Sequence, residues 1–177
     1  MKNTALLIID VQNELVEAGP FNIDKTLSNI QILTDVCREN GIEVIYSQHD
    51  EDEIEELKIF SYGWEIHSSI CPKPGEKVIW KNYNSAFKNT ELDEYLKSKD
   101  IQTLIIVGMQ TEYCIDTTCR IAFEKGYKII MPEETNTTFE NGNLSGSEIY
   151  EHHNFRIFKN RFAEVKSLEE VISDLRT

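Results

Sequence analysis

Three side chains capable of nucleophilic catalysis stand at or just beyond the ends of apolar runs in this sequence. They are Asp10 after residues 5–9, Lys81 after residues 78–80, and Cys114 shortly after residues 103–107. A deprotonated thiol attacks carbonyl and nitrile carbons. A carboxylate can take up the thiol proton and return it to a leaving nitrogen, while a nearby ammonium favours the thiolate. Together these residue types indicate cleavage of an amide-like bond.

Alternating strands and helices are predicted to position these side chains. Short apolar runs, typical of strands buried on both faces of a parallel sheet, occupy residues 5–9, 42–46, 78–80, 103–107 and 127–131, and we expect a further strand near 155–158. Helices are expected over residues 25–39, 91–99, 114–125 and 144–153, and after Ser167. The expected helix starts are an N-cap at Asp24 and capping boxes at Thr90 with Asp93 and at Ser167 with Glu170.

This alternation predicts an α/β fold. Strand–helix–strand units connect in a right-handed sense and give a parallel sheet covered by helices on both faces. We therefore expect a single domain over residues 1–177, with three α/β/α layers and a doubly wound parallel sheet of about six strands. In the strand order 3-2-1-4-5, the first and fourth strands are neighbours where the order reverses, and ligands bind at the carboxyl ends there. Asp10 and Cys114 then face each other across that crevice.

Each of the three side chains also has an ordinary structural interpretation. A lone cysteine is most often a small buried hydrophobic residue, an aspartate at a strand end often caps a turn, and a lysine there is often solvated. Their coincidence at one edge of the predicted sheet is what favours catalysis. Cys114 also starts a predicted helix, whose free N–H groups and dipole favour a thiolate and could hold an oxyanion.

The composition excludes several classes of partner. The net charge is −13, with much of the acidity at residues 50–56, so nucleic acid and anionic membranes are repelled. No run reaches the roughly 18 apolar residues of a membrane span, and the N-terminus lacks the pattern of a signal peptide. We expect a cytoplasmic protein that acts on a small molecule. The four cysteines form no CxxC pair and predict neither a disulfide framework nor a zinc site.

Three motifs carry a resemblance to a known family. They are Asp10-Val11-Gln12-Asn13 after the first predicted strand, Lys81 after the third, and Gly108-Met109-Gln110-Thr111-Glu112-Tyr113-Cys114 after the fourth. In this order they resemble the isochorismatase-like cysteine hydrolases, which include nicotinamidases, N-carbamoylsarcosine amidases, streptothricin hydrolase and true isochorismatases. The likeness extends from about residue 4 to about residue 140. It implies the isochorismatase-like hydrolase fold, with Asp10, Lys81 and Cys114 as a catalytic triad.

The resemblance also implies a non-proline cis peptide bond between Met109 and Gln110. In the family, this bond aims the backbone N–H of Gln110, together with that of Cys114, at the developing oxyanion. Small residues are common where this chain has Met109 and Gln110, but the backbone role does not depend on the side chains. No cofactor is implied.

One departure from the family pattern argues against a metal centre. Nicotinamidases carry a metal-binding Asp-x-His after the second strand, and here the stretch reads Ser47-Gln48-His49-Asp50. Ser47 replaces the carboxylate poorly, and His49 with His67 alone makes a poor metal site. We therefore expect no metal and interpret His49 as a pocket residue, which disfavours nicotinamidase activity.

Several residues near the predicted site are candidates for substrate binding, although core packing is the alternative for each aromatic one. The candidates are Gln12, His49, Trp64, Tyr83, Phe87 and Tyr113. Residues 63–67 and 81–87 resemble the streptothricin-hydrolase type of branch. An intact Cys114 favours C–N bonds over the vinyl ether of isochorismate, whose hydrolysis requires no thiol.

Other functions stay open at this point. Vinyl ether hydrolysis of the isochorismatase type is one, and a catalytically idle binding protein on the same fold is another. A redox sensor built on Cys114 is a third, although Cys119 is poorly placed as its resolving partner. Because oligomers are usual in the family, we expect a homo-oligomer in which residues 49–76 form a lid or a subunit contact. The sequence does not specify the substrate.

Overall fold

The computed structural model describes residues 2–51 and 54–176, so Asp52 and Glu53 of the acidic run lie outside the described residues. The strands of the sheet are β1 (Thr4–Ile9), β2 (Glu43–His49), β3 (Lys77–Lys81), β4 (Thr103–Met109), β5 (Lys128–Pro132), β6 (Asn136–Thr137) and β7 (Glu164–Lys166). The α-helices are α1 (Asn13–Glu17), α2 (Ile23–Glu39), α3 (Leu92–Ser98), α4 (Asp116–Glu124), α5 (Gly146–His152) and α6 (Leu168–Leu175). Shorter helical turns are η1 (Glu55–Leu57), η2 (Ser68–Ile70), η3 (Thr111–Ile115) and η4 (His153–Phe158).

The strands run in the order β3-β2-β1-β4-β5-β7, and each neighbouring pair is parallel. The two-residue strand β6 extends the pairing at the carboxyl end of β4. The predicted doubly wound sheet is confirmed, and β1 and β4 are neighbours at the point where the strand order reverses. A ligand site is expected at their carboxyl ends.

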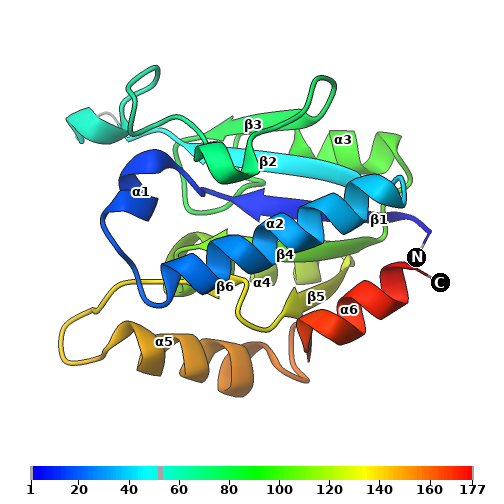
Figure 1. Cartoon of the computed structure of the whole chain (residues 1–177). Helices are drawn as coiled ribbons and strands as arrows, with labels where there is room; N and C mark the ends of the chain where they lie inside the picture. Colours follow the sequence, from blue (N-terminus) through cyan, green and yellow to red (C-terminus); the bar gives the residue numbers. More distant parts are fainter. Residues whose placement is uncertain (1, 52–53, 177) are drawn as a thin grey trace.

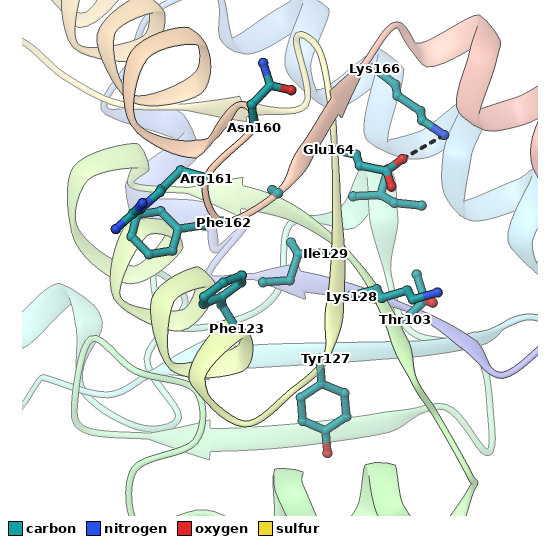
Figure 2. A pocket seen from close by; sticks show the side chains of 12 residues that line it. Thr103, Phe123, Tyr127, Lys128, Ile129, Asn160, Arg161, Phe162, Glu164 and Lys166 are labelled. Atoms are coloured by element: carbon teal, nitrogen blue, oxygen red, sulfur yellow. Dashed lines mark ion pairs between the residues drawn. The ribbon is translucent and has the colours of Figure 1, made fainter.

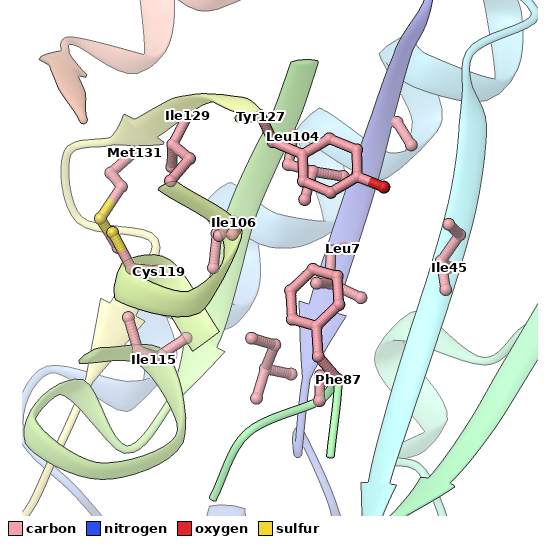
Figure 3. Packing of buried hydrophobic residues seen from close by; sticks show 14 of the residues in the cluster. Leu7, Ile45, Phe87, Leu104, Ile106, Ile115, Cys119, Tyr127, Ile129 and Met131 are labelled. Atoms are coloured by element: carbon pink, nitrogen blue, oxygen red, sulfur yellow. The ribbon is translucent and has the colours of Figure 1, made fainter. Parts of the chain in front are cut away.

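Helices cover both faces of the sheet (Figure 1), with α2 and α6 on one face and α3 and α4 on the other. Strand β1 is buried along its whole length, and its alternate residues supply both cores. Leu6 packs on the α2 side, whereas Leu7 packs on the opposite side (Figure 3). This two-sided burial explains why the central strands are continuous apolar runs. Each fully buried aliphatic side chain contributes about 1.5–3 kcal/mol.

Gly108 brings the carboxyl ends of β1 and β4 together. It pairs with Ile9 in the sheet and has a φ of +118°. A Cβ atom at this position would lie 2.0 Å from the carbonyl oxygen of Ile9. Only glycine permits both this backbone conformation and this close approach. The strand ends that carry Asp10 and lead to Cys114 are therefore neighbours.

The predicted strand near residues 155–158 is wrong. Residues His153–Phe158 form a π-helical turn that continues α5, and the last strand is Glu164–Lys166. The apolar alternation at Phe155 and Ile157 indicated a strand. In the fold, however, Phe155 packs its ring against Tyr150 of α5, and Phe158 enters the core. Tertiary packing therefore outweighs the local pattern.

Two of the predicted helix starts are also wrong, while the capping box of Ser167 with Glu170 is present. Helix α2 begins at Ile23 after Asn22, so Asp24 lies in its first turn and is not its cap. The N-cap of α3 is Glu91 and not Thr90. The Thr90 hydroxyl still accepts the Leu92 N–H at 3.4 Å, but the Asp93 carboxylate binds Lys97 and other neighbours and does not complete a capping box. None of the described helices combines the length and apolar composition that crossing a bilayer requires.

Candidate active site

Asp10, Lys81 and Cys114 converge at the carboxyl edge of the sheet. Asp10 follows β1, Lys81 ends β3, and Cys114 lies in the turn η3 after β4. The Nζ atom of Lys81 is 2.6 Å from Oδ2 of Asp10 and 3.3 Å from Sγ of Cys114. A single ammonium therefore contacts both a carboxylate and a thiol, although the three residues are far apart in sequence.

The surrounding residues hold the Asp10–Lys81 ion pair in place. The Ser47 hydroxyl donates to Oδ1 of Asp10 at 2.9 Å, and the Asp10 N–H donates to the Ser47 carbonyl at 3.1 Å. Lys81 also donates to the carbonyl of Tyr83 at 3.2 Å. The side chains of Lys81 and Asp10 are only 0% and 1% exposed. Such a buried pair needs these additional hydrogen bonds, because its charges have lost water.

The electrostatics of the site keep Lys81 charged. Burial lowers the pKa of Lys81, but the neighbouring Asp10 and Cys114 raise it by more, so the net shift is upward. Burial raises the pKa of the Cys114 thiol, Asp10 raises it further, and Lys81 opposes both without cancelling them. Burial and Asp10 therefore favour the neutral thiol of Cys114, whereas Lys81 favours the thiolate.

The prediction that a helix begins at Cys114 is wrong. Cys114 does not start an α-helix, because α4 begins at Asp116 and Cys114 is the fourth residue of η3. Because η3 begins at Thr111, the N–H of Cys114 is the last of the four first-turn N–H groups. The carboxylate of Asp10 lies within 4.8 Å of Sγ of Cys114.

His49 is a fourth member of the cluster. Its Nδ1 atom lies 3.2 Å from Nζ of Lys81, and its Nε2 atom lies 3.4 Å from Oε2 of Glu51. Because an ammonium can only donate, Nδ1 accepts and the ring proton lies on Nε2. Gln12 holds the His49 backbone, accepting from its N–H at 2.8 Å and donating to its carbonyl at 2.9 Å.

The cluster forms the floor of a pocket of about 160 Å³. Its described lining residues are Asp10, Leu15, His49, Glu51, Ile54, Leu57, Asn84, Met109, Gln110, Tyr113 and Cys114. Of the six predicted binding residues, His49 and Tyr113 line this pocket. Sequence reasoning missed its apolar wall and two polar residues, Glu51 and Asn84. Glu51 and Asn84 lie in irregular segments, and Leu15 and Leu57 lie in short helical pieces, so no periodic pattern marks their side chains as pocket-facing.

The other four predicted binding residues are not among the described residues that line the pocket. Gln12 is fully buried and bridges the backbones of His49 and Trp64. Trp64 is buried, and the centroids of its ring and the ring of Trp80 are 5.3 Å apart. These residues support the pocket without forming its surface.

Tyr83 and Phe87 also have other environments. The Tyr83 ring is 42% exposed, and the Lys88 ammonium lies 3.8 Å from its centroid. Phe87 belongs to the hydrophobic core and stacks on Tyr127, with the two ring centroids 6.0 Å apart (Figure 3). For Phe87 the packing interpretation holds. Tyr83 contributes its carbonyl group to Lys81.

The ligand atoms of Asp10, His49 and Cys114 lie within 4.8 Å of one another, a spacing at which a metal ion could bind. However, the Lys81 ammonium contacts all three side chains. A second cation would be repelled at this position. In the described part of the chain, His67 does not belong to this group; its Nδ1 is 2.8 Å from the hydroxyl of Ser69.

The backbone beside Cys114 has an unusual geometry. The peptide bond between Met109 and Gln110 is cis. The Gln110 carbonyl accepts the N–H groups of Tyr113 at 3.1 Å and Ile115 at 3.2 Å. Gln110 lines the pocket next to Cys114, so its backbone is held beside the thiol.

A larger hollow of about 480 Å³ lies at the opposite edge of the sheet (Figure 2). It is bordered by Thr103, Lys128 and Glu164, the first residues of β4, β5 and β7. Phe123 and Phe162 form an apolar part of its wall. Its described lining offers no cysteine, histidine or aspartate, so the smaller pocket is the candidate active site.

The isochorismatase domain family matches residues 4–170 of the chain. The chain belongs to the isochorismatase family. It is 30% identical over 139 residues to streptothricin hydrolase of Streptomyces noursei, covering 77% of this chain and 55% of that protein. It is 28% identical over 193 residues to N-carbamoylsarcosine amidase of an Arthrobacter species, covering 97% of this chain and 70% of that protein.

A solved structure of an isochorismatase family protein has the same fold. It superposes with a TM-score of 0.88 at 34% identity, covering 94% of this chain and 99% of that chain. Together with the hydrolase and amidase names of the relatives, this likeness makes the protein an isochorismatase-family hydrolase.

Proposed function

We propose that this isochorismatase-family hydrolase cleaves a C–N bond of an amide-like small molecule through a covalent intermediate on Cys114. The observation that carries the proposal is the buried Lys81 ammonium, which contacts both Asp10 and Cys114 at the floor of the pocket. The similarity to an amidase supports the same bond class. A chain that only bound ligands would not need a nucleophile, a base and a cation in mutual contact.

The acylation step begins from the neutral thiol. As Sγ of Cys114 attacks the substrate carbonyl carbon, the Asp10 carboxylate takes up the thiol proton. The backbone N–H groups of Gln110 and Cys114 receive the developing oxyanion. Asp10 then gives the proton to the leaving nitrogen, the C–N bond breaks, and a thioester remains on Cys114.

The deacylation step uses the same groups in reverse. A water molecule attacks the thioester carbon, and Asp10 accepts its proton. The carbon–sulfur bond breaks, the acid product leaves, and sulfur regains a proton from Asp10. In both steps, negative charge leaves Asp10 as it takes up a proton and develops on the substrate oxygen; in deacylation it then passes to the Cys114 sulfur as the carbon–sulfur bond breaks. Lys81 contacts the Asp10 oxygen and the Cys114 sulfur and stabilises negative charge on either atom.

The test is ammonia release from a panel of small primary amides and ureido compounds by the wild type, Cys114→Ala and Cys71→Ser. Cys71 is exposed and free, so its variant controls for loss of a thiol elsewhere. We expect turnover to be lost only in Cys114→Ala. Acid-quenched wild type should carry the acyl group on the peptide that contains Cys114. Amide cleavage that persists in Cys114→Ala would refute the mechanism, and isochorismate cleavage that persists there would favour vinyl ether hydrolysis.

A further inference from the structure

We propose that the pocket favours cationic or neutral ligands over anionic ones, and that Glu51 determines this preference. For the substrate class, cationic or neutral amides, the inference rests on the function proposed above. The charge preference itself concerns the pocket and can be measured without turnover.

The charges that border the pocket do not balance. Among its described lining residues, Asp10 and Glu51 are acidic and none is lysine or arginine. Lys81 lies beneath the pocket, where its ammonium is paired with Asp10 at 2.6 Å. Burial and Asp10 raise the pKa of the Cys114 thiol, which favours its neutral form. One carboxylate, that of Glu51, therefore remains without a lysine or arginine partner among the ion pairs of the described residues.

Glu51 is placed where a ligand can reach it. Its backbone is tied to the pocket wall, donating to the Leu57 carbonyl at 3.3 Å and accepting from the Ile54 N–H at 3.1 Å. Its side chain is 41% exposed. The contact with Nε2 of His49 involves Oε2, which leaves Oε1 available to a cationic group. A ligand held over Cys114 thus meets an acidic group at one side of the pocket.

The rest of the wall suggests the form of the ligand. Leu15, Ile54 and Leu57 supply apolar surface beside Glu51, which suits a short aliphatic chain. The geometry points to a small amide whose aliphatic chain ends in an ammonium or an uncharged group. One partly solvated carboxylate near a ligand charge changes relative affinity by about tenfold. Anionic amides of the same size are disfavoured by the same carboxylate.

A first experiment compares three amides of matched shape: butanamide, 3-aminopropanamide and succinamate, which are neutral, cationic and anionic. We measure kcat/KM from ammonia release for the wild type, Glu51→Gln and Glu55→Gln. The amide oxygen introduced by Glu51→Gln can still accept the His49 proton, so this variant removes charge and preserves the contact. We expect Glu51→Gln to reduce the preference for 3-aminopropanamide over succinamate by about tenfold. Glu55 is exposed and outside the pocket lining, so its variant should retain the wild-type preference.

A second experiment needs no turnover. Cys114 is alkylated at alkaline pH with 2-bromoethylammonium, iodoacetamide or iodoacetate, and its rates are normalised to those of exposed Cys71 in the same molecule. In the wild type, we expect iodoacetate to alkylate Cys114 slowly relative to Cys71. In Glu51→Gln, the ratio of the normalised alkylation rate with 2-bromoethylammonium to that with iodoacetate should fall about tenfold. A ratio that Glu51→Gln leaves unchanged would overturn the inference. If the ratio changes but no amide is cleaved, the charge preference stands and the proposed function fails.

Discussion

Replacement of Lys81 by methionine should be among the more damaging single changes in this protein. Methionine fills a similar volume but removes the ammonium from a site in which Lys81 and Asp10 are 0% and 1% exposed. The Asp10 carboxylate is then buried with the Ser47 hydroxyl at 2.9 Å as its remaining side-chain donor. We expect the free energy of unfolding to fall by about 3–5 kcal/mol.

The geometry of the pair sets this magnitude. At the observed separation of 2.6 Å and an effective dielectric constant of about 20, Coulomb attraction is about 6 kcal/mol. The cost of removing both charges from water offsets much of that attraction in the intact pair. In the variant, the carboxylate stays buried without its cation. Lys97→Met is the matched control, because Lys97 pairs with Asp93 but its side chain is 70% exposed. We expect this variant to lower the free energy of unfolding by about 0–1 kcal/mol.

The assay is urea unfolding of the wild type, Lys81→Met, Asp10→Asn and the double variant. The double variant should be less destabilised than the sum of the single variants, because removing both charges leaves neither unpaired. Burial lowers the pKa of Lys81, but Asp10 and Cys114 raise it overall. The contribution of the Lys81 charge should therefore be fully present near neutral pH and should be lost as pH rises above the ordinary lysine value of 10.5 and through the raised pKa of Lys81. A cost below about 1 kcal/mol for Lys81→Met would refute this reasoning.

Two further predictions follow from the shifted pKa values. After burial, the Asp10 carboxylate is the main cause that raises the pKa of Cys114. Asp10→Asn should therefore speed the alkylation of Cys114 by iodoacetamide relative to that of Cys71, while slowing turnover by about 10²–10⁴-fold. An unchanged alkylation rate would show that Asp10 does not raise this pKa. Burial raises the pKa of Asp93, but hydrogen bonds from Lys97 and other neighbours outweigh it and lower the pKa to about 2. This carboxyl group stabilises the fold above its ordinary value of 3.8, and the contribution is lost as pH falls towards 2. Asp93→Asn should therefore lower the free energy of unfolding by about 1–2 kcal/mol at pH 7 and weaken the pH dependence of urea unfolding between pH 3.8 and 2. A variant with the wild-type pH profile of stability would show that Asp93 does not cause this acidic loss of stability.

The sequence by itself determined strands β1 to β5 and their place in a parallel sheet, but not β6 and β7. The runs at residues 5–9 and 104–107, which became most of β1 and β4, are apolar because both of their faces are buried, and that pattern is local. Asp10 and Lys81 interrupt or end such runs, so their place at one edge was predictable once the strands were parallel. The order of the first five strands is that of the usual doubly wound pattern.

Only the tertiary structure decided what surrounds those side chains. Whether Cys114 rests as a thiol depends on burial and on its proximity to Asp10, and neither is encoded in sequence spacing. Gln12 was predicted to bind substrate, but its amide is used by two backbone segments that meet it in the fold. Glu51 belongs to the acidic run at residues 50–56, which does not single it out, yet it lines the pocket. Periodicity reports which face of an element is buried, whereas desolvation, charge pairing and pocket shape arise from contacts between segments that are distant along the chain.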